Sequence, residues 1–357
     1  MEAVGALGIL LRAGLDAQAE IPCREFDGVS WPDLYAMAAS QGVSAFAWDG
    51  ACRLPAAVQP PRALRLQWAY NVEQIEMRYR RQWRAAAELA RIYAENGIRT
   101  VVLKGFAVSR LYPRPEHRPC GDLDCFLGAG YERGNTLAAA AGAKVDADYY
   151  KHSHIVFRGL TVENHRFCTA IRGSRQAKAF ERHLQSILAS QPCPPILGTD
   201  LLAPPADFNA LFLTKHALLH FLTEGISLRH LCDWALFVDR QGEQVDWPEF
   251  RRVAAEHGLL RFAEVMTRLA VRLLGVKEDV FPVDAALDPL ADRVLSNMLY
   301  ERRHLNDTAG NVWVKRFRMV AGIWHDRWKY RDIYQRSVCR EIFRFMSGFL
   351  VERKPEI

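Results

Sequence analysis

The chain has 357 residues, of which 50% are hydrophobic and 25% are charged. These proportions exclude an intrinsically disordered chain and are typical of a globular protein of about two domains. No apolar run reaches the roughly 18 residues of a membrane-spanning helix, so we expect no membrane span. The eight cysteines are scattered, without a Cys-x-x-Cys pair, and the short apolar N-terminus lacks the basic start of a signal peptide. We therefore expect a cytoplasmic location.

The net charge of +6 is concentrated near the C-terminus. Residues 301–357 contain 13 Lys/Arg and 7 Asp/Glu, so the preceding residues are neutral overall. Aromatic residues alternate there with bases: Trp313, Lys315, Trp324, Arg327, Trp328 and Lys329. Such a segment can bind single-stranded nucleic acid by stacking and charge. The alternative, which the interspersed acids favour, is a helical segment that packs its aromatic residues and exposes its charges.

The first quarter of the chain is predicted to be helical. Apolar residues three or four apart predict a helix over 31–48. Residues 62–96 contain no Gly or Pro and repeat apolar residues at the same spacing, which predicts one long helix or two, ended by Gly97. We take residues 1–96 as an N-terminal helical region.

The pattern then becomes strand-like, and residues 97–176 are predicted to form a small α/β core. In chain order, the patterns predict a strand at 100–103, a short helix at 106–112, a strand at 122–127, a helix at 130–142, and strands at 155–157 and 160–165 joined by a hairpin turn at Arg158-Gly159.

The remainder, residues 177–357, is predicted to be a C-terminal helical region. Its candidate helices are 177–190, 206–223, 227–240, 247–256, 259–274, 285–305 and, with breaks, 312–350. The expected fold class is therefore α+β, with a small mixed β-sheet embedded in a mostly helical chain.

The segment around Asp122 and Asp124 carries the clearest chemical signal. Alternate residues of a strand point the same way, so these carboxylates project together while Leu123 points into the core. Two such close carboxylates repel unless a cation lies between them. Mg²⁺, or Mn²⁺ in its place, suits oxygen ligands of this kind. A solvated strand face is the alternative explanation of the same spacing.

A third carboxylate occurs on another predicted strand. Glu163 and His165 share one face by the same alternation. If this strand lies beside the one that carries Asp122, Glu163 completes an acidic triad. It is also a candidate base that deprotonates an acceptor hydroxyl.

Four segments together resemble a known family. Leu103-Lys-Gly-Phe-Ala-Val-Ser-Arg-Leu-Tyr-Pro113 and Arg118-Pro-Cys-Gly-Asp-Leu-Asp124 resemble a bacterial nucleotidyltransferase family of the polymerase-β-like superfamily. Val162-Glu-Asn-His165 resembles its strand with an acid two residues before a His, and Leu228–Asp233 resembles part of its helical portion. The likeness covers about residues 98–275.

The resemblance implies a nucleotidyltransferase fold in which Asp122, Asp124 and Glu163 bind the metal. It implies an enzyme that moves an NMP group from an NTP to an unidentified acceptor and releases pyrophosphate. A small molecule, a peptide or a tRNA is a candidate acceptor. The alternative is a protein of the same fold that senses nucleotide without turnover.

Residues around the first predicted strand are candidates for holding the triphosphate. A strand that passes through Gly105 into a helix presents backbone N–H groups to phosphate, Lys104 adds a charge, and Arg118 can bind phosphate in bidentate fashion. The predicted nucleotide-binding residues are Lys104, Gly105, Arg118 and Gly121. The alternatives are a tight turn at Gly105 and a salt bridge from Arg118 to Asp122 or Glu116.

Polar residues of the helical region are candidates for binding the acceptor. His216 and His220 are four residues apart and share a helix face, as do Arg229 and Asp233. The predicted substrate-binding residues are His165, Lys215, His216, Arg229 and Asp233. The alternative is a structural cluster, in which Arg229 and Asp233 pair with each other.

Two His-x-x-Cys pairs offer a different metal. His117 with Cys120 and His165 with Cys168 would supply two imidazoles and two thiolates, which is a ligand set for zinc. The strand position of His165 disfavours this hypothesis, because His165 and Cys168 would have to leave the strand face to bind one ion together.

Overall fold

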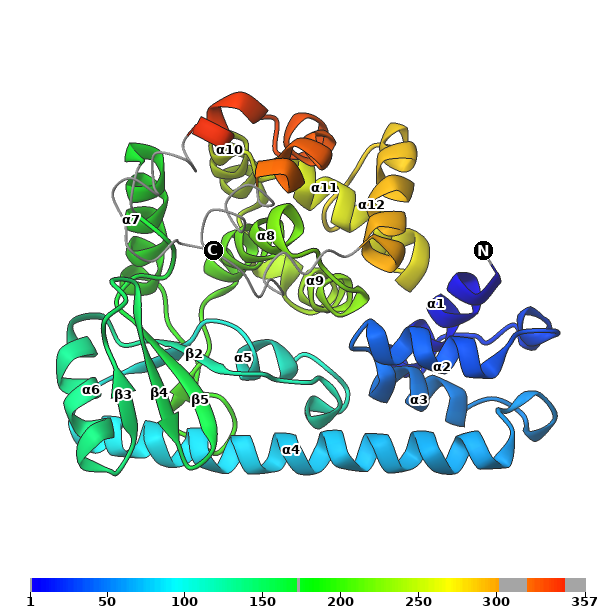
Figure 1. Cartoon of the computed structure of the whole chain (residues 1–357), viewed down its shortest axis with the longest axis horizontal. Coiled ribbons are helices and arrows are strands. Elements are labelled where there is room, and N and C mark those ends of the chain that lie inside the picture. The colour runs from blue at the N-terminus through cyan, green and yellow to red at the C-terminus, as the bar shows by residue number, and fades with distance from the viewer. Residues whose placement is uncertain (1, 172–173, 302–319, 344–357) are drawn as a thin grey trace.

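The computed structural model describes residues 2–171, 174–301 and 320–343. One sheet lies at one end of the molecule, three N-terminal helices lie at the other, and the later helices lie above both (Figure 1). The long helix α4 (Arg62–Glu95) runs beneath the sheet and the N-terminal helices. The fold is α+β with a helix-rich chain, as predicted.

The N-terminal region contains α1 (Glu2–Leu15), α2 (Trp31–Ser40) and α3 (Ser44–Cys52). The single helix predicted over 31–48 is wrong, because Gly42 has a φ of 68° and ends α2 in the left-handed region. The side chain of Gln41 there bridges distant elements, donating to the carbonyl of Met298 at 3.1 Å and accepting from the backbone N–H of Leu228 at 3.0 Å.

Helix α4 is a single element of 34 residues, about 51 Å long. Near its start, the buried Trp68 donates from Nε1 to the carbonyl of Ser44 at 2.9 Å, which ties α4 to α3. Towards its end, the buried side chains of Tyr79 and Tyr93 belong to the hydrophobic cluster beneath the sheet. One helix therefore supports both ends of the molecule (Figure 1).

Six strands form one mixed sheet in the order β3-β4-β5-β2-β1-β6. Their bounds are β1 (Thr100–Val102), β2 (Leu123–Phe126), β3 (Lys144–Asp146), β4 (His152–Phe157), β5 (Leu160–His165) and β6 (Leu201–Leu202). The β2–β5 and β1–β6 pairs are parallel and the other pairs are antiparallel. The predicted hairpin turn is confirmed, since Arg158 and Gly159 have φ values of 49° and 78°.

The other helices are α5 (Phe106–Ser109), α6 (Tyr131–Ala140), α7 (Arg175–Ser190), α8 (Ala206–Thr223), α9 (Leu228–Gln241), α10 (Trp247–His257), α11 (Leu260–Leu269) and α12 (Asp288–Tyr300). Helix α11 continues as a π-helical turn, Ala270–Leu274. Short 3-10 helices occupy Cys23–Phe26, Ala56–Val58, Pro115–His117, Gly128–Gly130, Gly242–Gln244 and Ala285–Leu287. Buried residues of α1–α3 share one hydrophobic cluster with those of α8–α12, so the packing crosses the predicted boundaries at 96 and 176.

A buried polar network fixes the underside of the central strands. Asn164 donates to the hydroxyl of Tyr93 at 2.8 Å and to Asn135 Oδ1 at 3.2 Å, and its own Oδ1 accepts from the thiol of Cys125 at 3.0 Å. Because strand residues alternate, holding Asn164 against α4 turns its neighbours Glu163 and His165 to the opposite face.

The described part of the basic C-terminal segment packs against the helices. Trp328 and Tyr330 are buried, and the ammonium of Lys329 donates to the carbonyl of Phe221 at 3.0 Å and lies 3.3 Å from Asp326 Oδ2. Trp324 is exposed. This packing favours the helical alternative over nucleic-acid stacking for residues 320–343; Trp313 and Lys315 lie outside the described residues.

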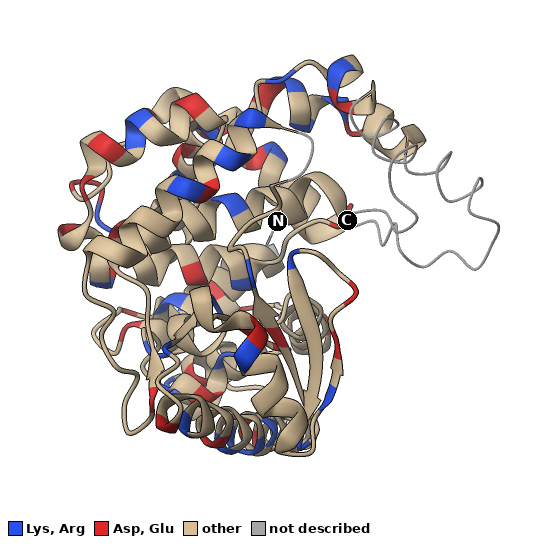
Figure 2. Cartoon of the chain, turned by 90° about the vertical axis from the view of Figure 1, so that its left-hand side faces the viewer, with Lys and Arg blue, Asp and Glu red and all other residues tan. Residues whose placement is uncertain are grey.

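The surface charges are mixed. Figure 2 shows Lys/Arg and Asp/Glu side by side along the helices of the face in view. Within the described residues, no helix is both long enough and apolar enough to cross a membrane.

Two glycines allow α1 and α3 to touch backbone to backbone. A Cβ on Gly50 would collide with the carbonyl of Leu10, and one on Gly14 with the carbonyl of Phe46. We expect Gly50→Ala to lower the free energy of unfolding by about 2 kcal/mol or more, because neither backbone can yield. Gly5→Ala is the matched control: its added methyl meets no atom of the described residues within 4 Å, so the helix should gain up to about 1 kcal/mol. Urea unfolding followed by circular dichroism measures both; a Gly50→Ala protein as stable as wild type would contradict the close packing.

Candidate active site

Three carboxylates converge on one face of the sheet. Strand β2 pairs with β5 in parallel, and the register places Asp124 opposite Glu163. Asp122, Asp124 and Glu163 each offer an oxygen atom, and these atoms lie within 4.8 Å of one another. The condition under which Glu163 completes the acidic triad, that the two strands lie side by side, is thus met. The pairing brings the carboxylates together although they are about 40 residues apart in the chain.

Lys104, two residues after the end of β1, faces these acids. Its Nζ lies 3.0 Å from Asp124 Oδ2 and 3.7 Å from Asp122 Oδ1. Burial lowers the pKa of Lys104, but Asp124 and Asp122 outweigh it and raise the pKa above its usual value. One ammonium cannot balance three carboxylates, so the cluster retains excess negative charge.

The two aspartates have opposite pKa shifts. Burial, followed by the charge of Asp124, raises the pKa of Asp122. Burial would also raise the pKa of Asp124, but Lys104 and His165 lower it well below its usual range. Asp124 is therefore the carboxylate that stays ionised most firmly.

His165 lies among the carboxylates. Its Nε2 is 3.1 Å from Asp124 Oδ1 and 3.4 Å from Glu163 Oε2. Burial lowers the pKa of His165, but Asp124 and Glu163 raise it above the usual value overall. The side chain is buried and does not line the cavity described next, so a direct contact with the acceptor is not supported.

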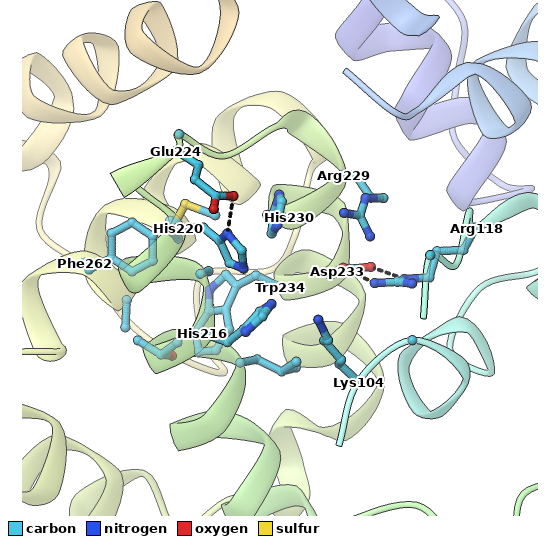
Figure 3. A pocket seen from close by; sticks show the side chains of 18 of the residues that line it. Lys104, Arg118, His216, His220, Glu224, Arg229, His230, Asp233, Trp234 and Phe262 are labelled. Atoms are coloured by element: carbon cyan, nitrogen blue, oxygen red, sulfur yellow. Dashed lines mark hydrogen bonds and ion pairs between the residues drawn. The ribbon is translucent and has the colours of Figure 1, made fainter. Parts of the chain in front are cut away.

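A cavity of about 280 Å³ opens beside the acids. The sheet side contributes Lys104, Gly105, Gly121 and Asp122, and helices α8, α9 and α11 contribute the opposite wall. The helical wall includes His216, His220, Arg229, Asp233, Trp234 and Phe262 (Figure 3). The predicted nucleotide-binding residues and most of the predicted substrate-binding residues thus line one cavity.

Arg118 is paired with Asp233. Its Nε donates to Asp233 Oδ1 and its Nη2 to Asp233 Oδ2, both at 2.7 Å (Figure 3). Asp233 Oδ1 also accepts from the hydroxyl of Tyr112 at 2.7 Å. The remaining Nη1 donates to the carbonyl of Pro119 at 3.2 Å. The geometry therefore corrects two expectations. Arg118 is not free to clamp a phosphate, and Asp233 pairs with Arg118 rather than with Arg229.

Arg229 lines the cavity beside this ion pair. Within the described residues its guanidinium makes no hydrogen bond or ion pair, and Figure 3 shows it next to the Arg118–Asp233 pair. Burial, and after it the charge of Arg118, lowers the pKa of Arg229. An arginine in this setting is suited to an anion from outside the chain.

Three histidines of the cavity are held neutral. Burial lowers the pKa of His216, His220 and His230, and in each case a nearby cation lowers it further. The sequence did not single out His230, Trp234 or Phe262. The sequence feature that could have indicated His230 is its position three residues after Ser227, as in a capping box. In the structure the backbone N–H of Ser227 donates to His230 Nδ1 at 3.1 Å.

Lys215 differs from its neighbour His216. Its ammonium lies 5.9 Å from the ring centre of Tyr334, and it is not among the residues that line the cavity. Successive residues of a helix point about 100° apart, and here His216 lines the cavity while Lys215 does not. The expectation that Lys215 faces the acceptor pocket is therefore not met.

The two His-x-x-Cys pairs do not converge. His117 is held between Asp49, 2.6 Å from Nδ1, and Glu76, 2.9 Å from Nε2, while Cys120 Sγ lies 3.5 Å from Arg118 Nη1. Within the described residues, the groups with metal-binding spacing contain carboxylates and imidazoles and no thiolate. The zinc hypothesis for these pairs is wrong.

This arrangement, three convergent carboxylates beside a cavity, defines a candidate nucleotide-transferring enzyme, and a family comparison agrees. The model of a family described as uncharacterised nucleotidyltransferase matches residues 27–275, well over half of the chain. The chain belongs to this family. No curated protein and no solved structure matches it. The matched range includes the carboxylates and both walls of the cavity.

The Arg118–Asp233 pair should contribute to stability in a pH-dependent way. We expect Asp233→Asn to cost about 3 kcal/mol near neutral pH, because it leaves a buried guanidinium without its charged partner. Arg118 holds the pKa of Asp233 below its usual value, although burial alone would raise it. The advantage of wild type over Asp233→Asn in free energy of unfolding is therefore complete above about pH 4. It shrinks as the pH falls towards the lowered pKa of Asp233 in the folded state.

Urea unfolding of both proteins near neutral pH and near pH 3 measures this difference. Asp200→Asn, at an exposed position, serves as the control and should change little at either pH. A cost for Asp233→Asn that does not shrink with acid would contradict the assignment.

Proposed function

We propose that this protein transfers a nucleoside monophosphate from a metal-bound NTP to an acceptor, with release of pyrophosphate. The observation that carries the proposal is the register of β2 and β5, which brings Asp124 opposite Glu163 with Asp122 on the same face. Membership of the nucleotidyltransferase family supports the same reaction class.

The donor set fits a divalent metal. Asp122, Asp124 and Glu163 offer only oxygen atoms, which Mg²⁺ prefers, and Mn²⁺ accepts the same ligands. The excess negative charge left by Lys104 gives a physical reason for a dication. When bound, the metal would supply charge neutralisation and orientation for the reacting phosphate.

The sheet side of the cavity suits the nucleotide. Lys104, Gly105 and Gly121 line it next to Asp122. The φ of 58° at Gly105 allows the backbone to turn sharply between β1 and α5. Because α5 has only four residues, we assign the phosphate contact to Lys104 and to the backbone of the turn rather than to a helix dipole.

In the reaction, an acceptor oxygen would form a bond to the α-phosphorus while the bond from that phosphorus to the bridging oxygen of pyrophosphate breaks. The acceptor proton must go to a base. Burial would raise the pKa of Glu163, but His165 lowers it below its usual value, which makes Glu163 a weaker base and a better metal ligand. His216, whose imidazole lines the cavity wall, is a second candidate for that proton, although burial lowers its pKa as well.

The helical side of the cavity suits an acceptor with an anionic group. Arg229 offers donors there that no described residue engages, while Trp234 and Phe262 offer apolar surface. Arg118 and Asp233 position this wall rather than bind substrate. A small molecule, a peptide or the end of a tRNA can carry such a group.

The central test uses NTPs labelled at the α-phosphorus with an extract of small molecules, peptides and tRNA as acceptors. Label transfer and pyrophosphate release should require Mg²⁺ or Mn²⁺. Asp122→Asn, Asp124→Asn and Glu163→Gln should each reduce them by about 100-fold or more, since each removes a charged ligand of the metal. The exposed Asp200→Asn should behave as wild type. Binding of Mg·NTP without any label transfer would favour the nucleotide sensor instead.

Arg229→Gln tests the acceptor side. We expect label transfer to fall about tenfold or more, because a charge-assisted hydrogen bond to the acceptor is lost. The Kd of a non-hydrolysable NTP with Mg²⁺, measured by calorimetry, should stay within about twofold of wild type. Arg240→Gln, on the exposed face of the same helix, is the control. A large loss of NTP affinity would instead assign Arg229 to the triphosphate.

A further inference from the structure

A group of histidines lies next to the carboxylates on the same face of the sheet. Strand β4 pairs with β5 antiparallel, and the register places His152 opposite His165 and His154 opposite Glu163. Alternation along β4 turns His152 and His154 to the face that carries the acids. The ring centres of His152 and His165 are 4.9 Å apart.

The hydrogen bond of His165 fixes which nitrogen faces the acids. Its Nδ1 lies 3.0 Å from the carbonyl of Phe167, and a carbonyl only accepts, so Nδ1–H is the donor. A neutral imidazole then directs the lone pair of Nε2 towards Asp124 Oδ1, at 3.1 Å, and Glu163 Oε2, at 3.4 Å. A lone pair facing two carboxylate oxygens is repulsive unless a proton or a metal ion lies between them.

A ring nitrogen of His152 also faces Glu163. Its Nε2 lies 3.3 Å from His154 Nε2, so one of these nitrogens donates to the other. Its Nδ1 is buried and makes no hydrogen bond to any residue that the structure describes, although it lies 3.3 Å from Glu163 Oε2. A buried nitrogen without a hydrogen bond is costly unless something absent from the protein chain binds it.

The spacing of these atoms fits coordination to one ion. Two ligand atoms that each lie 2.0–2.1 Å from a zinc ion at the tetrahedral angle are about 3.3 Å apart. Glu163 Oε2 lies 3.3 Å from His152 Nδ1 and 3.4 Å from His165 Nε2. The three residues offer ligand atoms that all lie within 4.8 Å of one another.

We propose that His152, Glu163 and His165 form a site for a first-row transition-metal dication such as Zn²⁺, adjoining the carboxylate triad through Glu163. Two imidazole ligands favour such ions over Mg²⁺, which prefers oxygen. The bond from His165 to the Phe167 carbonyl is the outer contact that holds a metal-binding imidazole in its tautomer. Three protein ligands leave a position for water or for a substrate oxygen.

The site stands apart from the nucleotidyl transfer proposed above, since it can bind its ion whether or not turnover occurs. Its physical rival is a proton on His165 Nε2, which would relieve the same repulsion without a metal. The two explanations differ in what happens when a transition metal is added.

The test titrates the purified full-length chain with Co²⁺, a coloured stand-in for Zn²⁺. We expect ligand-field absorption of a site with nitrogen ligands, which Zn²⁺ abolishes and excess Mg²⁺ leaves intact. His152→Gln and His165→Gln should each weaken Co²⁺ binding by about 100-fold or more, beyond what loss of an outer contact alone costs. Asp122→Asn, which removes a ligand of the triad alone, and His257→Gln, whose ring packs on Phe180, should both retain it.

A second measurement needs no variant. In the Co²⁺ protein, proton NMR should show two strongly shifted imidazole N–H signals, with that of His165 protected from exchange by its bond to Phe167.

Co²⁺ binding that survives in both histidine variants but is lost in Asp122→Asn would overturn the proposal, because the ion would then lie in the triad. Loss in all three variants, or absence of shifted N–H signals from wild type, would also overturn the separate site. Circular dichroism of each variant confirms that it is folded.

Discussion

The arrangement of this protein depends on the parallel pairing of β2 with β5. That pairing brings three carboxylates within 4.8 Å of one another on a partly buried face. Two unit charges at that separation repel by roughly 3–4 kcal/mol at an effective dielectric constant of about 20. Folding therefore has to overcome this repulsion, and neighbouring side chains reduce it. Lys104, just after β1, lies 3.0 Å from Asp124 Oδ2, and its charge offsets part of the repulsion, while His165 Nε2 lies 3.1 Å from Asp124 Oδ1.

The opposite face of the same strands stabilises this unfavourable arrangement. Leu123 and Val162 pack into the cluster above α4, and Asn164 is hydrogen-bonded to Tyr93 of α4. A slip of one residue in register would bury the acids and expose this face. Helix α4 is thus a structural condition for the site, although it contributes none of the residues that line the cavity.

The cavity depends on a second constraint, the link between the sheet and the helices. Arg118 lies in the loop that leads into β2, and Asp233 lies on α9, so their buried ion pair fixes the distance between the two walls. An arginine that had seemed suited to phosphate therefore has a positioning role. Arg229, one helical turn before Asp233, keeps its donors because Asp233 is already engaged. The Arg118–Asp233 ion pair thus explains why Arg118 is structural and Arg229 is available to a ligand.

The sequence by itself determined the elements and their chemistry. Alternation along single strands predicted that Asp122 and Asp124 share one strand face and that Glu163 and His165 share another. Helical spacing predicted α4 and most later helices. Both predictions succeeded because these periodicities are local. The break at Gly42 and the start of β4 at His152 were missed, since a φ value and a strand end depend on neighbours in space. Only the tertiary structure decided that β5 lies beside β2 and that Arg118 binds Asp233. It alone brings His152 next to Glu163 and turns Lys215 away from the cavity. These contacts join residues distant in the chain, and no local pattern encodes which of several possible partners a buried charge will meet.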